Sequence, residues 1–202
     1  MTGWNRRSFL SAAALVAVQS AVPGGAQVLA KLDPKDAPSP QRRKFMRMVA
    51  DHVIPATGTP GAGAVGAGDF VLVALAHGLE GTRQQADVAF APFLRADGSL
   101  DHVSWLKARL GPTWPTLPPA RRHDALAALD AAAYAPPIKS DPAPAAPWRA
   151  IKGLILTGYY TSEIGGSKEL NYELVPGRFD PKVPVTPATR AYSSDWTAVD
   201  FG

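Results

Sequence analysis

The sequence predicts an all-α domain of four to six helices with an extended, Pro-rich C-terminal tail. Apolar residues recur every three or four positions in several segments, which is the spacing of one helix face. No segment alternates apolar and polar residues over the length of a strand. The 20 prolines and 18 glycines require long irregular connections. With 202 residues, 46% of them hydrophobic, the chain can bury one core, which we assign to residues 31–164, followed by a tail at 165–202.

The first helix is expected to begin at Ser39 and Pro40, a cap and first-turn pair, and to end before Pro55. Its apolar face comprises Phe45, Met46, Val49, His52 and Val53. Beside that face lies a basic cluster of Arg42, Arg43, Lys44 and Arg47. Such a cluster is usually a solvated face, and the alternative is contact with an acidic surface of a partner.

Four further helices follow from capping residues and apolar spacing. Asp69 is expected to cap a helix over residues 70–79, and Thr82 is expected to cap one over 82–91. A turn at Asp97-Gly98 precedes a helix over 99–110, which Gly111-Pro112 ends. The last of the four is an Ala-rich helix over 120–134, with Leu126 and Leu129 inward, before a Pro-rich linker.

An apolar stripe at alternating steps of three and four predicts a final helix over residues 147–160. The stripe comprises Trp148, Ile151, Ile155, Gly158 and Ser162. Gly153 and Gly158 each cost about 1 kcal/mol relative to Ala, so we expect another backbone to approach closely there. Gly165-Gly166 is expected to stop the helix at positive φ. The tail beyond is extended and carries Phe179, Tyr192, Trp196 and Phe201, and it either wraps its own domain or lies along another protein.

Composition excludes several kinds of site. The chain has no cysteine, so disulfides, Cys-ligated zinc, iron–sulfur clusters and covalently attached haem are excluded. Lys and Arg exceed Asp and Glu by four, and two of these charges lie in the N-terminal leader, which leaves little support for nucleic-acid binding. The four histidines show no metal-ligand spacing. They are His52, His77, His102 and His123. We therefore expect no catalytic site, no cofactor and no metal in this chain.

A literal G-x-G-x-x-G occurs at Gly61, Gly63 and Gly66. A dinucleotide-binding loop must leave a strand and open a helix, whereas this loop follows a helical segment with Pro55 and Pro60 intervening. We interpret it as a flexible loop, or as one that a partner orders.

Residues 1–30 are expected to form a twin-arginine export signal. Arg6 and Arg7 are followed by Phe9 and Leu10, and then by an Ala-rich run too short to span a bilayer. The twin-arginine translocase would deliver the protein to the periplasm, with cleavage near Gly24-Gly25-Ala26 or, as a second choice, Val28-Leu29-Ala30. The alternative is an uncleaved amphipathic anchor.

Two segments resemble one protein family. The run LTGYYTSEIGGSKELNYELVPGRFD covers residues 156–180, and ADHVIPAT covers residues 50–57, followed by Thr59-Pro60-Gly61-Ala62. Together they resemble the gluconate 2-dehydrogenase subunit 3 family, which contains the small subunits of flavin-dependent sugar, sugar-acid and polyol dehydrogenases. With the leader, the resemblance spans nearly the whole chain.

The resemblance implies a non-catalytic subunit that escorts, exports and stabilises a large dehydrogenase subunit of the glucose-methanol-choline oxidoreductase type. FAD and the chemistry would belong to that large subunit, and electrons would leave through a cytochrome c subunit or another acceptor. The subunit would work in the periplasm, on its own or docked at the inner membrane through the complex. Aromatic and Arg residues are enriched at interface hot spots. We therefore assign the partner interface to Tyr159, Tyr160, Thr161, Glu163, Tyr172 and Arg178. The alternative for the tyrosines is that they close the core of this chain.

Two other functions remain open on sequence grounds. The chain could be a small exported enzyme, in which case the purified chain alone would hold flavin or show turnover. It could also be a binding module for a partner unrelated to dehydrogenases, and stable association with a non-flavoprotein would then be observed.

Overall fold

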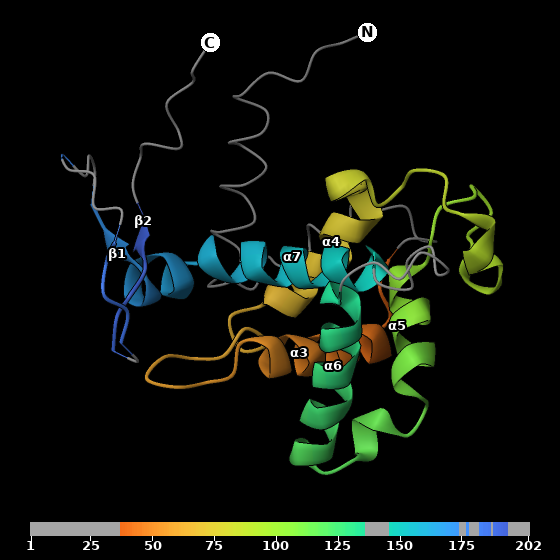
Figure 1. Cartoon of the computed structure of the whole chain (residues 1–202). Helices are drawn as coiled ribbons and strands as arrows, with labels where there is room; N and C mark the ends of the chain where they lie inside the picture. The colour runs from red at the N-terminus through yellow and green to blue at the C-terminus, as the bar shows by residue number, and fades with distance from the viewer. Residues whose placement is uncertain (1–36, 136–145, 174–176, 178–181, 187, 194–202) are drawn as a thin grey trace, which may run out of the picture.

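A computed structural model describes residues 37–135, 146–173, 177, 182–186 and 188–193. Within these residues the fold is carried by five α-helices, which confirms the predicted fold class (Figure 1). They are α3 (Pro40–Val53), α4 (Ala67–His77), α5 (His102–Leu110), α6 (Pro119–Tyr134) and α7 (Ala146–Tyr160). Short helical turns connect them, namely η1 (Leu79–Gly81), η2 (Val88–Phe93), η3 (Trp114–Thr116) and η4 (Gly165–Glu169). The leader at 1–30 lies outside the described residues.

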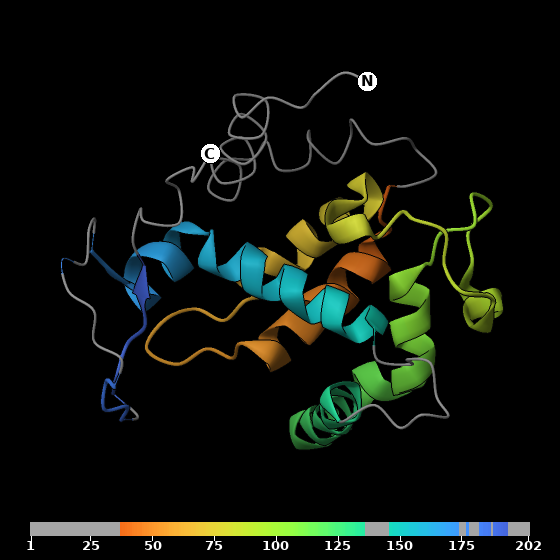
Figure 2. The ribbon, with the colours of Figure 1, turned by 45° about the horizontal axis from the view of Figure 1, so that its top comes forward.

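The last helix, α7, is the centre of the fold. It packs mainly against α4 and also contacts α3, α5 and α6, and Figure 2 shows it running across α3 and α4. Its buried side chains include those of Trp148, Ile151, Leu154, Ile155 and Tyr159. These residues include or flank the predicted stripe, so the sequence-based helix and its inward face are confirmed.

Polar contacts join α6 to α7. Asp130 accepts hydrogen bonds from Trp148 Nε1 at 2.7 Å and from Lys152 Nζ at 2.8 Å. The Trp148 ring is 1% exposed, so its indole N–H has a partner where water cannot reach it. The α6 helix is therefore held on α7 by specific bonds as well as by packing, and Leu126 and Ala133 are its buried apolar residues.

The two glycines of α7 behave differently from one another. A Cβ at Gly158 would come 2.6 Å from Phe70 Cδ1, so a side chain of α4 fills the space above it. Nothing lies within 4 Å of a Cβ at Gly153. The expected close approach by a backbone is therefore wrong at both positions. It occurs elsewhere, at Gly68 of α4, where a Cβ would come 2.7 Å from the backbone of Met46 and Arg47.

The α3 helix begins and ends as predicted. Ser39 Oγ accepts a hydrogen bond from Arg42 N at 3.3 Å, and the helix ends at Val53, before Pro55. The basic cluster beside it is only partly a solvated face. Arg42 pairs with Asp101, and Arg47 donates to Asp69 from Nε at 2.8 Å, so two of the four cations are paired with carboxylates of the same chain.

The predicted start of α4 is corrected by the structure. The helix begins at Ala67, after Gly66 with φ of 88°, and Asp69 lies in its first turn. Gly66, and not Asp69, is therefore the N-cap residue of α4, and glycine permits the left-handed backbone conformation found there. Asp69 instead accepts from Arg47, and so ties the start of α4 to α3.

The predicted helix over residues 82–91 is wrong. Gly78 and Gly81 have positive φ and end α4 with a tight turn, which Thr82 closes by donating from Oγ1 to the carbonyl of Leu79 at 2.8 Å. The polar segment beyond has no apolar face that could pack as a helix. It continues into the 3₁₀ turn η2, which includes Pro92, and pairs at isolated bridges with Ser99 and Leu100.

The predicted boundaries of the next two helices need small changes. Ser99 does not begin α5, because its N–H and its hydroxyl both bond to Asp97 within the predicted Asp97-Gly98 turn. Asp101 is the cap instead, and its Oδ1 accepts from Ser104 N at 3.1 Å. The α5 helix ends at Gly111 with φ of 84°, and α6 begins at Pro119 with Leu126 buried, as the sequence indicated.

Candidate partner-binding surface

The segment with the family-like motif forms one end of the molecule. The α7 helix ends at Tyr160, η4 follows, and β1 (Asn171–Tyr172) lies beside β2 (Tyr192–Ser193). Figure 1 shows these elements at one end, with η2 at the opposite end. We call the segment 158–173 the aromatic corner.

A buried tyrosine holds the aromatic corner together. Tyr159 is 1% exposed, and its hydroxyl lies 3.3 Å from Thr59 Oγ1, 3.3 Å from the carbonyl of Pro60 and 3.4 Å from Glu169 Oε1. Thr59 also donates to Glu169. Burial raises the pKa of the Tyr159 hydroxyl, so this group stays a neutral donor. Three distant segments therefore meet at one side chain.

Glycine and hydroxyl groups shape the turn that follows α7. Ser162 Oγ donates to the carbonyl of Tyr159 at 2.6 Å and accepts from Gly165 N at 3.1 Å. A Cβ at Gly165 would overlap the carbonyl oxygen of Tyr159. The expectation of positive φ at Gly165-Gly166 is wrong, because both lie in the π-helical turn η4. Gly165 is needed here for close approach.

The glycine-rich loop after α3 is held by its own chain. Asp51 Oδ1 accepts from Gly63 N at 2.8 Å, and Ala62 N donates to the carbonyl of Ile54 at 2.9 Å. A Cβ at Gly61 would come 2.7 Å from the Asp51 carboxylate. The glycines thus make room for a carboxylate of α3, and a phosphate would meet like charge there. This corrects the expectation of a loop that is flexible or ordered by a partner.

An arginine from the tail closes the far side of the aromatic corner. Arg190 donates from Nε to the carbonyl of Glu169 at 3.2 Å, and its Nη2 donates to the carbonyls of Lys168 and Leu170. Asn171 N donates to the carbonyl of Ala191 at 2.8 Å, so β1 and β2 run parallel. The extended segment predicted after η4 is therefore present, as a two-residue strand.

The structure divides the residues assigned to the interface. Tyr160 is 41% exposed and Tyr172 is 60% exposed, and Thr161 and Glu163 also lie on the surface. Tyr159 is a core residue, as the alternative interpretation of the tyrosines predicted. It positions the corner and is too buried to contact a partner directly. Arg178 lies outside the described residues. Arg190 was missed because it lies outside both family-like segments. Thr59 belongs to the second segment but was not assigned a role, because only the fold brings it to Tyr159 and Glu169.

The match to a known family identifies the family of this chain. Residues 40–177 match a model of the family described as gluconate 2-dehydrogenase subunit 3. The chain belongs to the gluconate 2-dehydrogenase subunit 3 family. This family is the small subunit of dehydrogenase complexes. No curated protein and no solved structure matches the chain.

The part matched by the subunit 3 family runs from Pro40, the first residue of α3, to Gly177, beyond β1. It therefore includes the helical domain, the glycine-rich loop and the aromatic corner. It does not include residues 182–193, which carry Arg190 and β2.

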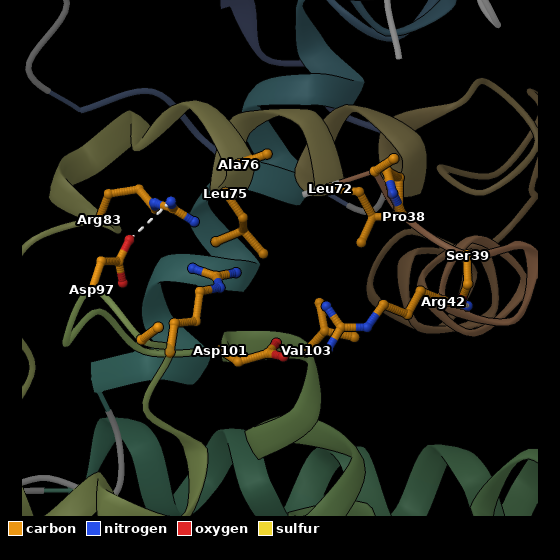
Figure 3. Close-up of a pocket in the computed structure, with 13 residues that line it drawn as sticks. Pro38, Ser39, Arg42, Leu72, Leu75, Ala76, Arg83, Asp97, Asp101 and Val103 are labelled. Carbon is orange, nitrogen blue, oxygen red and sulfur yellow. Dashed lines mark hydrogen bonds and ion pairs between the residues drawn. The ribbon is translucent and has the colours of Figure 1, made fainter. Parts of the chain in front are cut away.

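A cavity of this subunit 3 chain lies away from the aromatic corner. It has a volume of about 560 Å³ and lies between the start of α3, the end of α4 and residues 95–103 (Figure 3). Its charged walls are paired, since Arg83 lies 2.9 Å from Asp97 and Arg42 pairs with Asp101. Burial would raise the Asp101 pKa, but hydrogen bonds from Arg42 and Ser104 lower it. The Asp101 carboxylate in the wall of the cavity therefore stays ionised.

In the described part of the chain, no group of His, Asp and Glu side chains is arranged to hold a metal ion. Among the helices described, none combines the length and the apolar character that crossing a bilayer requires.

His52 is expected to make the stability of this subunit depend on pH. It is half-buried, with its ring 5.7 Å from Trp114 and 6.4 Å from His123. Burial lowers its pKa, as do Arg122 and His123, while Asp51 opposes them. Protonation therefore favours the unfolded chain, and the free energy of unfolding should fall as pH drops below about 6.5.

We expect His52→Gln to reduce this loss of stability between about pH 7 and pH 5, as measured by urea unfolding at several pH values. His77→Gln, which removes an exposed histidine at the end of α4, is the control. An unchanged pH profile in His52→Gln would show that His52 does not cause the dependence.

Proposed function

We propose that this chain is a non-catalytic small subunit that escorts and stabilises the large, FAD-containing subunit of a sugar or sugar-acid dehydrogenase. The observation that carries the proposal is the aromatic corner, which combines a rigid internal scaffold with exposed aromatic side chains. It lies inside the segment matched by a family of dehydrogenase small subunits.

The distribution of exposed apolar side chains supports this proposal. In the described part of the chain, nine large hydrophobic residues are exposed, and six of them lie at or beyond Leu156. The six are Leu156, Tyr160, Tyr172, Val183, Val185 and Tyr192. Exposed apolar residues that gather at one end of a protein are typical of a binding surface, whereas scattered ones need no explanation. We therefore place the large subunit against this end.

The exposed residues of the aromatic corner are held in place by contacts within the chain, which supports this end as the partner-binding surface. Tyr160 packs edge-on against buried Tyr159, with ring centroids 5.2 Å apart. Thr161 donates from Oγ1 to the carbonyl of Thr157 at 2.7 Å, which fixes the last turn of α7. An interface residue that is already held in place loses little conformational entropy on binding, so more of its buried area contributes to affinity.

Export and electron transfer complete the proposal. Arg6, Arg7, Phe9 and Leu10 form a twin-arginine signal in the sequence, and it would carry the folded pair to the periplasm. FAD would be bound by the large subunit, and a cytochrome c subunit would take the electrons. These assignments rest on the sequence resemblance.

Substituting Tyr160 with Ala is expected to reduce recovery of the complex about tenfold, because an exposed aromatic anchor at an interface contributes 1 kcal/mol or more. The measurement is an affinity pull-down from the native envelope fraction, in which the flavin absorbance of the eluate is compared per mole of this chain. Tyr134→Ala, which removes a 55% exposed tyrosine of α6, is the matched control.

The same pull-down separates the proposed function from its rivals. A wild-type chain that elutes alone, folded and colourless, would contradict the escort function. Flavin bound to the isolated chain, with turnover, would identify it as an enzyme. A stable non-flavoprotein partner would identify a binding module of another kind.

A further inference from the structure

The pairing of β1 with β2 is unusual for a surface element. Parallel strands occur almost only where both faces of the sheet are covered, and a two-stranded pair is marginally stable in water. Here each strand has two residues, and Tyr192 of β2 is 62% exposed. An element of this kind indicates that further protein covers it in the working assembly.

The segment that leads into β2 has the same character. Val183 is 56% exposed and Val185 is 82% exposed, and every described residue from 182 to 192 lies on the surface. Pro184 restricts Val183 before it to extended backbone, and residue 187 is a second proline. In an extended chain, residues two apart share a face, so Val183 and Val185 can enter one groove together. We call residues 182–193 the C-terminal arm.

The arm is anchored near its C-terminal end, by Arg190 and by the pairing of β2 with β1. The Arg190 guanidinium donates to three consecutive carbonyls, those of Lys168, Glu169 and Leu170, at the end of η4. Thr186 N also donates to Thr189 Oγ1 at 2.8 Å, which forms a turn just before this anchor. The arm is thus fixed to the aromatic corner at Arg190, while its apolar residues face solvent.

We propose that the C-terminal arm docks in an apolar groove of the large dehydrogenase subunit, with Val183 and Val185 inserted and Arg190 as the residue that positions the arm. This inference rests on the proposed function and names a second contact beyond the family-matched segment. The partner is the dehydrogenase subunit because the arm continues the surface that carries Tyr160 and Tyr172, and because the family consists of subunits of such complexes.

Pre-extended backbone makes such a contact favourable. A segment held extended by prolines gives up little entropy when it binds, and an extended segment can also add its backbone hydrogen bonds to a strand of the partner. The anchor at Arg190 raises the effective concentration of the arm once the aromatic corner has bound. The two contacts are therefore expected to act together.

The experiment compares full-length Val183→Ser/Val185→Ser with Val88→Ser. The control removes a valine that is as exposed (81%) as Val185 (82%) from η2, at the opposite end of the molecule. Each chain is used to pull down the large subunit, and flavin absorbance per mole of chain is measured. We expect at least a tenfold loss for the double variant and no loss for Val88→Ser. Both should keep the wild-type circular dichroism spectrum and melting temperature, because the substituted side chains are exposed.

A second variant tests the positioning residue. Arg190→Gln removes the guanidinium fork and is expected to weaken capture about fivefold while leaving the helical domain unchanged. Capture by the double variant equal to that by Val88→Ser overturns the arm proposal and leaves the proposed function intact. Failure of the wild-type chain to capture any flavoprotein overturns both. A double variant that captures normally but loses self-association in solution shows that a second copy of this chain occupies the arm, which also overturns the proposal.

Discussion

Replacing Tyr159 with Ala should lower the free energy of unfolding by about 3–5 kcal/mol, the range for truncating a large buried aromatic residue. The ring is buried at the end of α7, and its hydroxyl joins Thr59, Pro60 and Glu169. Its loss leaves a cavity and also leaves the Glu169 carboxylate with one polar neighbour fewer. Thermal unfolding should show a melting temperature lower by about 10 °C.

Two further variants separate the ring of Tyr159 from its hydroxyl. Tyr159→Phe keeps the packing and removes the hydrogen bonds, so it should cost about 1 kcal/mol. Tyr134→Ala, at an exposed position, should change the melting temperature by no more than a few degrees. If Tyr159→Ala and Tyr134→Ala melted together, the hydroxyl cluster would not be the centre of this end of the molecule. Because Tyr159 supports Tyr160, we also expect Tyr159→Ala to weaken capture of the large subunit.

Gly68→Ala is the second substitution with a large expected effect. A Cβ there would come 2.7 Å from the backbone of Met46 and Arg47, so α3 and α4 must move apart to admit one methyl group. Backbone cannot rotate aside as a flexible side chain can, and overpacking of this kind costs about 1–3 kcal/mol. The loss should appear in urea unfolding as a lower midpoint with an unchanged slope.

Gly153→Ala is the matched control for Gly68→Ala. Both substitutions add the same methyl group within an α-helix, but nothing lies within 4 Å of a Cβ at Gly153, which is exposed on α7. Alanine should therefore stabilise the protein by up to about 1 kcal/mol through helix propensity alone. Opposite signs for the two substitutions are expected. Equal signs would show that the contact between α3 and α4 is looser than the structure has it.

Helices with strong apolar spacing could be predicted from the sequence. The stripe of α7 and the face of α3 give both the presence of these helices and the sides that they bury. The predicted helix over 82–91 is wrong because a capping residue and a proline do not produce a helix when the segment has no apolar face to pack. Thr82 serves a turn there, and the positive φ of Gly78 and Gly81 could not be read from residue identity alone.

The candidate surface could be predicted from the sequence, but the separate roles of its residues could not. Tyr159 and Tyr160 are adjacent and chemically the same, yet one is 1% and the other 41% exposed, because neighbouring positions on a helix point about 100° apart. Their roles are set by where α7 meets the loop that carries Thr59, which lies 100 residues earlier in the chain. Arg190 was missed for the same reason, since its partners lie about 20 positions away across the turn.

The central position of α7 also determines when this protein can fold during synthesis. The four described helices made before it all contact α7, and α5 and α6 rely on it to enclose their apolar sides. A ribosome that has made only the first 145 residues has therefore produced helices without the element that joins them. The aromatic corner begins within the last turn of α7, so we expect the proposed partner surface to be completed directly after the core. A nascent chain would acquire the ability to bind its partner at the moment when it becomes a folded protein.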